Sequence, residues 1–162
     1  MSAIDERTFR NVTGRFATGI CVLSARHADG FPIGMTVNSF SSVSLNPPLV
    51  LVCLSKEVRR AEVILGAPAF NLSILAGDHQ ELSGHFARHG MGEFPEGADF
   101  PLGVNGVPFM PGALAVLECT PEARLPGGDH DILLGRVTTL SEGEGDDPLL
   151  YFAGGYRRLS RD

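Results

Sequence analysis

Most hydrophobic stretches of this chain are short and end in glycine, proline or polar residues, a pattern typical of β-strands. The first two stretches flank the polar segment RHADG, which predicts an antiparallel hairpin. The continuous, β-branched LVLVCL predicts a strand that is buried on both faces. The predicted strands cover residues 18–25, 32–40, 49–54, 70–75, 113–125, 131–140 and 149–159.

Three segments have the pattern of short helices. Residues 5–16 place Phe9, Val12 and Phe16 on one side, which predicts an amphipathic helix. Ser55 can cap a second helix that begins near Lys56. Asp78 can cap a third helix, which runs through Glu81 and Phe86.

Residues 90–112 are rich in Gly, Pro and Phe and have no periodicity, which suggests a lid or binding loop. Because strands dominate, we expect a mainly β fold, a β-barrel with a few peripheral helices. The length of 162 residues predicts one domain spanning residues 1–162.

The charge pattern excludes several kinds of partner. A formal net charge of -6 with few clustered cations argues against nucleic acid or an anionic membrane surface as a partner. No apolar run reaches the length of a membrane span, and the charged amino end MSAIDERTFRN is unlike a signal peptide, so we expect a cytoplasmic protein. Cys21, Cys53 and Cys119 each lie in an apolar stretch and are interpreted as reduced core thiols, not as a disulfide framework or a metal cluster.

A row of small hydroxyl residues in GMTVNSFSSVSLNPP, residues 34–48, is the first candidate binding segment. Small side chains leave backbone N–H groups accessible, as a planar heteroaromatic ligand rich in acceptors requires. The alternative is a serine-rich loop without a ligand.

A second candidate is the start of the helix after Leu54. Free N–H groups at a helix start attract phosphate, and Lys56, Arg59 and Arg60 follow closely. The alternative is that these cations form the solvated face of an amphipathic helix.

Histidines are the remaining candidates. His130 lies in the turn GGDHD between two predicted strands, where it can contact a substrate ring or be a surface residue only. His85 and His89 are four residues apart, but HExxH is absent and a third ligand is not apparent, so we expect no metal site. The sequence also lacks a GxSxG elbow and a GxGxxG fingerprint after a strand, which argues against a serine hydrolase and a Rossmann domain.

Taken in order, several segments resemble the FMN-binding split-barrel flavin reductases, the small reductase components of two-component flavin-dependent monooxygenases. The resemblance covers nearly the whole chain. It is carried by GRFATGICVLSA, GMTVNSFSSVSLNPPLVLVCL, ILAGDHQELSGHFA, LECTPEARLPGGDHDILLGRV and PLLYFAGGYRRL. It implies a Greek-key split barrel of about six strands, and a homodimer.

The resemblance also implies an activity, the reduction of FMN or FAD by NADH or NADPH and the supply of reduced flavin to a partner monooxygenase. His130 is implied to lie against the nicotinamide, and Tyr156 to lie in the segment that closes over the site. The isoalloxazine ring is implied to contact Thr36, Val37, Asn38 and Ser39, with Ser41 and Ser42 nearby. The ribityl phosphate is implied to contact Leu54, Ser55, Lys56 and Arg59. The rest of the flavin is implied to contact Ser83 and Phe86.

Departures from the family pattern leave some choices open. Val58, Arg59 and Arg60 replace a frequent Ser-x-Thr arrangement, so FMN versus FAD is undecided. Asp131 follows His130 where an uncharged residue is usual, and its charge would repel a phosphorylated nicotinamide, which favours NADH. The competing hypotheses are a split-barrel enzyme that retains its flavin and acts on its own small substrate, and a non-catalytic flavin- or haem-binding module.

Overall fold

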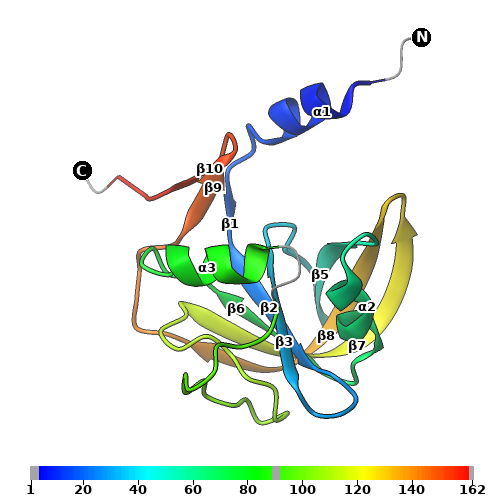
Figure 1. Ribbon diagram of the computed structural model, residues 1–162, viewed down its shortest axis with the longest axis vertical. Helices are drawn as coiled ribbons and strands as arrows, with labels where there is room; N and C mark the ends of the chain where they lie inside the picture. The colour runs from blue at the N-terminus through cyan, green and yellow to red at the C-terminus, as the bar shows by residue number, and fades with distance from the viewer. Residues whose placement is uncertain (1–3, 89–91, 161–162) are drawn as a thin grey trace.

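A seven-stranded antiparallel sheet forms the body of the protein (Figure 1). The computed structural model describes residues 4–88 and 92–160. The strand order is β3-β2-β6-β7-β8-β5-β4. These strands are β2 (Cys21–Arg26), β3 (Pro32–Val37), β4 (Ser41–Leu45), β5 (Pro48–Ser55), β6 (Phe70–Ile74), β7 (Ala115–Gly127) and β8 (His130–Glu142).

A second sheet of three strands lies beside the first, in the order β1-β9-β10. It contains β1 (Thr18–Gly19), β9 (Leu150–Phe152) and β10 (Gly155–Arg157), and the helices are α1 (Glu6–Thr13), α2 (Arg59–Gly66) and α3 (Gln80–Ala87). The predicted mainly β fold with peripheral helices is therefore confirmed. The main sheet has one strand more than the six expected, because the serine row forms β4.

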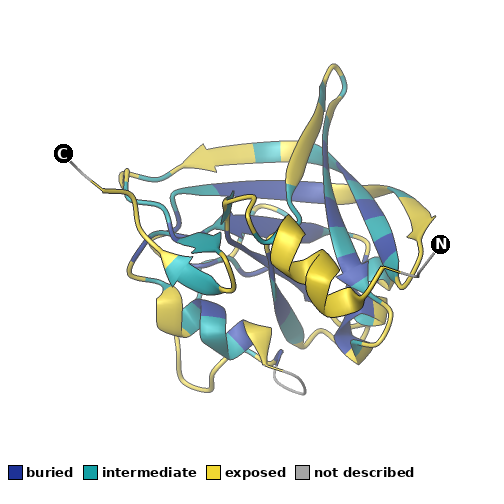
Figure 2. Ribbon diagram, turned by 90° about the horizontal axis from the view of Figure 1, so that it is seen from above, coloured by how far each residue is buried: buried dark blue, intermediate teal, exposed yellow. Residues whose placement is uncertain are grey.

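Two hydrophobic clusters lie on opposite faces of β2 and β6. Leu23 and Leu72 point into the first cluster, which α2 covers, and Val22 points into the second, which α3 and residues 92–114 cover. Figure 2 shows the buried strands inside a rim of exposed loops. Because both faces of β2 and β6 are covered, these strands are the rigid centre of the fold.

The prediction that residues 49–54 are buried on both faces is wrong. Side chains of β5 alternate between buried and half-buried, so that Val50 and Val52 enter the core while Leu51 and Cys53 do not. Burial on both faces is instead found in β2 and β6. The reason is position: β5 lies near the sheet edge, between β8 and β4, and its outer face is only partly covered.

Helix starts also differ from the prediction. Ser55 does not cap α2, because it pairs with His130 as the last residue of β5. The helix begins at Arg59, with Val58, which has no polar side chain, at the N-cap position. Asp78 does not cap α3, since His79 occupies that position.

The C-terminal segment predicted as one strand is a hairpin. Ala153 and Gly154 form its two-residue turn with φ of 50° and 77°, so the chain reverses between β9 and β10. Positive φ at both central positions matches the twist of a tight hairpin. The reversal places Tyr151 opposite Tyr156, with ring centroids 5.8 Å apart.

The segment expected to be a lid packs against the sheet through its second half, near Val107 and Met110, whereas residues 95–99 are exposed. Buried polar side chains of the sheet hold its backbone: Asn71 Nδ2 donates to Val107 O at 2.8 Å, and Ser73 Oγ accepts from Met110 N at 3.0 Å. Val107 and Met110 are themselves buried. Residues 89–91, which include His89, lie outside the described residues.

Helix α1 projects from the body (Figure 1). Asp5 caps it through Thr8 N at 2.9 Å, and every one of its residues is exposed. Phe9 and Val12 are 58% and 66% exposed. Among the described residues, no helix combines the length and apolar character needed to cross a membrane.

Candidate functional site

Four of the residues proposed from the sequence line one cavity of about 240 Å³, here named the Thr36 cavity. It lies where β3, α3 and the small sheet meet. Its wall consists of Ile20, Thr36, Asn38, Ser83, Ala87, Tyr151 and Tyr156. Apolar walls with a few hydrogen-bonding groups suit a flat heteroaromatic ring.

Hydrogen bonds fix the polar side of the Thr36 cavity. Thr36 Oγ1 donates to Ser83 O at 2.7 Å, which joins β3 to α3. The hydroxyl groups of Ser83 and Tyr156 lie 2.9 Å apart, which joins α3 to β10. Three elements distant in the sequence are therefore held together at the cavity wall.

The serine row starts beside this cavity. Ser39 Oγ accepts from Cys53 N at 2.9 Å and donates to Cys53 O at 3.1 Å, so it closes the gap between the end of β3 and β5. Ser41 and Ser42 follow as exposed residues of the edge strand β4, paired with Leu51 and Val50. The serine row is thus a strand rather than a loop.

A second group of predicted residues gathers at the end of β5. Ser55 pairs with His130, and Lys56 Nζ donates to Gly128 O at 2.6 Å. The turn between β7 and β8 consists of Gly128 and Asp129, with φ of 73° at Gly128, which an L-residue with a side chain rarely adopts. The turn leaves His130 partly exposed, with Nδ1 2.8 Å from Asp129 Oδ1.

Asp131 is buried and ion-paired. Its side chain is 7% exposed and accepts from Arg124 Nη2 at 2.7 Å, with Lys56 Nζ at 4.0 Å. The hydrogen bond from Arg124 lowers the pKa of the Asp131 carboxyl. Because this charge is already compensated, its repulsion of a phosphorylated nicotinamide is a weak argument for NADH.

Other predicted residues lie outside the Thr36 cavity. Arg59 lines a separate cavity of about 510 Å³ together with Glu57 and Arg60. The side chains of Val37, Leu54 and Phe86 lie in the core, so Val37 and Leu54 can contact a ligand only through their backbone. The Phe86 ring packs beneath Gly34 and against Phe94.

Sequence reasoning missed Tyr151, Ile20 and Ala87 of the Thr36 cavity. Ile20 and Ala87 carry no chemical signal, but the chain has only two tyrosines, and they line the same cavity. Recognising the hairpin in LLYFAGGYRRL would have placed both tyrosines opposite each other.

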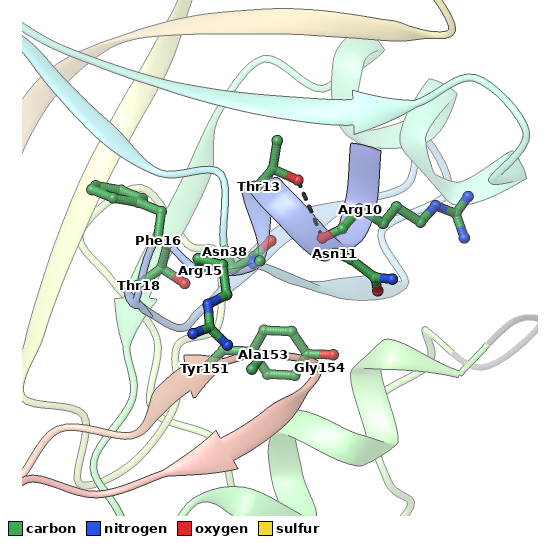
Figure 3. Close-up of a pocket in the computed structure, with 11 residues that line it drawn as sticks. Arg10, Asn11, Thr13, Arg15, Phe16, Thr18, Asn38, Tyr151, Ala153 and Gly154 are labelled. Carbon is green, nitrogen blue, oxygen red and sulfur yellow. Dashed lines mark hydrogen bonds between the residues drawn. The ribbon is translucent and has the colours of Figure 1, made fainter. Parts of the chain in front are cut away.

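Sequence reasoning also missed a larger cavity of about 620 Å³ between α1, Asn38 and the β9–β10 turn, here named the α1 cavity (Figure 3). Asn38 and Tyr151 line both this cavity and the Thr36 cavity, so the two are adjacent.

The sequence matches a family model and many curated proteins. Residues 13–160 match the flavin reductase like domain. The chain is 41% identical over 157 residues to the FMN reductase (NADH) SmoA of Agrobacterium fabrum, covering 97% of this chain and 88% of that protein. It is 40% identical over 154 residues to the reductase component of 4-hydroxyphenylacetate 3-monooxygenase from Thermus thermophilus, covering 95% and 97%.

A solved structure matches over the whole fold. The NADH:FAD oxidoreductase SgcE6 of Streptomyces globisporus, in complex with NAD and FAD fragments, superposes with a TM-score of 0.90. The two sequences are 37% identical over 100% of this chain and 99% of that one. The chain described here belongs to the flavin reductase like domain family.

Proposed function

We propose that this chain is an NADH-dependent flavin reductase that reduces FMN or FAD and supplies the reduced flavin to a separate flavin-dependent monooxygenase. Relatives named as an NADH-dependent FMN reductase and as a monooxygenase reductase component support this activity. The observation that carries the proposal is the Thr36 cavity, where residues implied by the family resemblance converge from β3, α3 and β10.

The Thr36 cavity is proposed to hold the flavin ring. Asn38 and Thr36 offer side-chain groups at the end of β3, and Tyr151 and Tyr156 offer aromatic walls. Ser39, Ser41 and Ser42 continue the polar surface along β4. Ser55, Lys56 and Arg59 are proposed to receive the phosphate, with Lys56 and Arg59 supplying positive charge.

A bound flavin supplies the electron chemistry, because its N5 accepts the hydride that leaves nicotinamide C4, and a proton from solvent completes the reduction. The residues of the chain are needed to bring the two rings within about 3 to 3.5 Å of each other. His130 is proposed to position the nicotinamide. It is partly exposed beside Ser55 and fixed by Asp129.

Replacing His130 tests this role. His130→Ala should slow flavin reduction by NADH in stopped-flow measurements, by about tenfold or more, since orientation of the reactants is lost. The Kd for flavin should stay within twofold of the wild-type value. Equal reduction rates in the variant and the wild type would remove His130 from the site.

The activity itself is tested with purified protein, FMN or FAD, and NADH or NADPH, followed by loss of nicotinamide absorbance. We expect turnover with NADH to exceed turnover with NADPH. Absence of flavin-dependent NADH consumption in all pairings would contradict the proposed function. Dialysis before the assay should remove the flavin, because a reductase of this kind treats flavin as a substrate.

We also propose that the protein is a homodimer. An eight-residue helix is marginal alone in water, and α1 buries none of its own residues. The first apolar face is on α1, where Phe9 and Val12 are exposed. The second is the outer face of strands β5 and β8, where Leu51 and Leu134 are partly exposed. Two incompletely covered apolar faces on one chain suit a two-fold interface between copies.

Light scattering after size exclusion tests the dimer. The wild type should elute with twice the mass of the chain. The double variant Phe9→Asp, Val12→Asp should elute as a monomer, while Arg7→Asp on the same helix should not change the mass. A wild-type monomer at micromolar concentration would contradict the proposal.

We further propose a cytoplasmic location and a single functional domain over residues 1–162. Three free thiols and the need for NADH both suit a reducing compartment. Fractionation that recovers the protein outside the cytoplasm would contradict this location.

A further inference from the structure

The first two residues of β8 point to opposite faces of the main sheet. Side chains of successive strand residues alternate between the faces, and along β8 Asp131 is buried while His130 and Ile132 are partly covered. His130 therefore lies on the outer face, where it is paired with Ser55. Asp131 lies on the inner face with Leu133, which belongs to the hydrophobic cluster that α2 covers.

Asp131 is a buried carboxylate whose place depends on a cation. Its side chain is 7% exposed, and its Oδ2 accepts from Arg124 Nη2 at 2.7 Å. Lys56 Nζ is the next cation, 4.0 Å from Oδ1. A buried carboxylate that loses its partner must reach water or take another cation, because an unpaired charge is costly in the interior. Without Arg124, the available cation is Lys56.

Lys56 is already engaged with the turn that carries His130. Its Nζ donates to Gly128 O at 2.6 Å, and its backbone N–H donates to Asp129 O at 3.0 Å. If the Asp131 carboxylate drew Lys56 Nζ toward itself, the Gly128 carbonyl would lose this donor. The turn would then be released on the side of His130.

Arg124 is itself fixed by α2. Its Nη1 and Nη2 donate to the two carboxylate oxygens of Glu62 at 3.1 and 2.7 Å. The planar guanidinium suits such paired contacts, so one arginine on β7 joins Glu62 of α2 to Asp131 of β8. Helix α2 thereby supports the start of β8.

The imidazole of His130 has only an exposed contact of its own. Its Nδ1 lies 2.8 Å from Asp129 Oδ1, and because a carboxylate only accepts, Nδ1 donates and Nε2 is directed to a ligand. The Asp129 side chain is 88% exposed, so this hydrogen bond orients the ring but does not hold the turn. The turn is held from the inner face.

We propose that Arg124 is a positioning residue for His130. Its guanidinium compensates Asp131, leaves Lys56 on the Gly128 carbonyl and so fixes the turn that presents the imidazole. The inference rests on the proposed function, in which His130 positions the nicotinamide. It also accounts for an acidic residue directly after His130, where the family resemblance leads one to expect an uncharged one.

Arg124→Gln tests the proposal in stopped-flow measurements. The rate of flavin reduction at saturating NADH should fall by about five- to tenfold, because the reacting rings lose their alignment. The Kd for flavin should stay within twofold of the wild-type value.

Arg136→Gln is the matched control. Arg136 donates to both carboxylate oxygens of Glu122 at 2.9 Å, also between β7 and β8, and its side chain is 42% exposed against 45% for Arg124. It lies farther along β8 from His130, so its loss should change the reduction rate by less than twofold. An equal loss of rate in both variants would overturn the proposal.

The same substitution in a His130→Ala background separates positioning from a general structural role. If Arg124 acts through His130, Arg124→Gln should change the reduction rate by less than twofold once the imidazole is absent. A general structural role would lower the rate in both backgrounds. An undiminished effect of Arg124→Gln in His130→Ala would therefore overturn the proposal.

Nitrogen NMR spectra of the histidine rings test the same role without flavin or NADH. The His130 signals are identified by their loss in His130→Ala. Arg124→Gln should shift or broaden them, Glu62→Gln should do so to a smaller extent because Arg124 stays on Asp131, and Arg136→Gln should leave them unchanged. Unchanged His130 signals in Arg124→Gln would overturn the proposal. If the wild type failed to oxidise NADH, the proposed function would fail, and these signals would still decide whether Arg124 fixes the imidazole.

Discussion

The hydroxyl groups of Ser83 and Tyr156 form the link that closes the Thr36 cavity. Ser83 is fully buried, and its Oγ lies 2.9 Å from Tyr156 Oη. We predict that Ser83→Ala and Tyr156→Phe each lower the free energy of unfolding by about 1 kcal/mol, as loss of one such hydrogen bond usually does. In a double-mutant cycle measured by urea unfolding, the coupling energy should also be about 1 kcal/mol. If the two substitutions changed the free energy of unfolding additively, the hydrogen bond between Ser83 and Tyr156 would contribute nothing to stability.

Arg124 makes the stability of the protein depend on pH. It donates to Asp131 at 2.7 Å and holds the pKa of that carboxyl below its ordinary value of 3.8. The folded state therefore keeps the charged form to a lower pH than the unfolded chain does. The stabilisation is fully present above pH 3.8 and is lost as pH falls through the lower, folded-state pKa.

Arg124→Met should accordingly be less stable than the wild type at pH 7, and the difference should shrink between about pH 5 and pH 2. Thermal unfolding across this range measures it. The control is the same substitution in an Asp131→Asn background. There, the loss of stability caused by Arg124→Met should vary much less with pH between about pH 5 and pH 2. A wild-type advantage that persists at pH 2 would assign the effect to packing of the arginine stem.

Helix α3 lies so close to β3 that one position has no room for a side chain. A Cβ on Gly34 would lie 2.6 Å from the buried ring of Phe86, whereas a Cβ on Gly84 would meet nothing within 4 Å. Gly34→Ala should destabilise the protein by about 1 to 3 kcal/mol through overpacking. Gly84→Ala should stabilise it by about 0.5 to 1 kcal/mol, because alanine favours the helix interior. Urea unfolding measures the free energy of unfolding of both variants. Equal changes in the two variants would contradict the close contact between Gly34 and Phe86.

Local patterns predicted which segments form helices and strands, but not what covers them. LVLVCL was expected to be the doubly buried strand because its residues are continuously apolar. Burial depends on neighbours in the sheet, and β5 lies beside the edge strand β4 while β2 lies under α2 and α3. The start of α2 was missed for a similar reason. Pairing with His130 draws Ser55 into β5, and local sequence does not reveal that partner.

The candidate site is assembled from residues far apart in the chain. The family resemblance named Thr36, Asn38, Ser83 and Tyr156, and the structure brings these four to one cavity. Tyr151 escaped prediction, because its place depends on a two-residue turn at an unusual φ. The α1 cavity depends on how α1 sits relative to the small sheet, and a helical pattern carries no information about that placement.

At the scale of the whole molecule, the proposed dimer would cover the Cys53 thiol at the interface between the two copies. Burial raises the pKa of both Cys21 and Cys119 to about 12, so neither forms the reactive thiolate near neutral pH. Cys53 is not the core thiol that its apolar stretch predicted, because it is only half-buried, on the outer face of β5, the face proposed to be covered in the dimer.

We therefore predict that one thiol per chain reacts with an aromatic disulfide reagent in the native protein, and that three react after unfolding. The native reaction should accelerate on dilution, because dissociation uncovers Cys53, and should be fast at all concentrations in the Phe9→Asp, Val12→Asp variant. Cys53→Ser should abolish it. A concentration-independent rate in a protein that light scattering shows to be dimeric would place the outer face of β5 outside the interface. The two copies would then have to meet through α1 alone or through another surface.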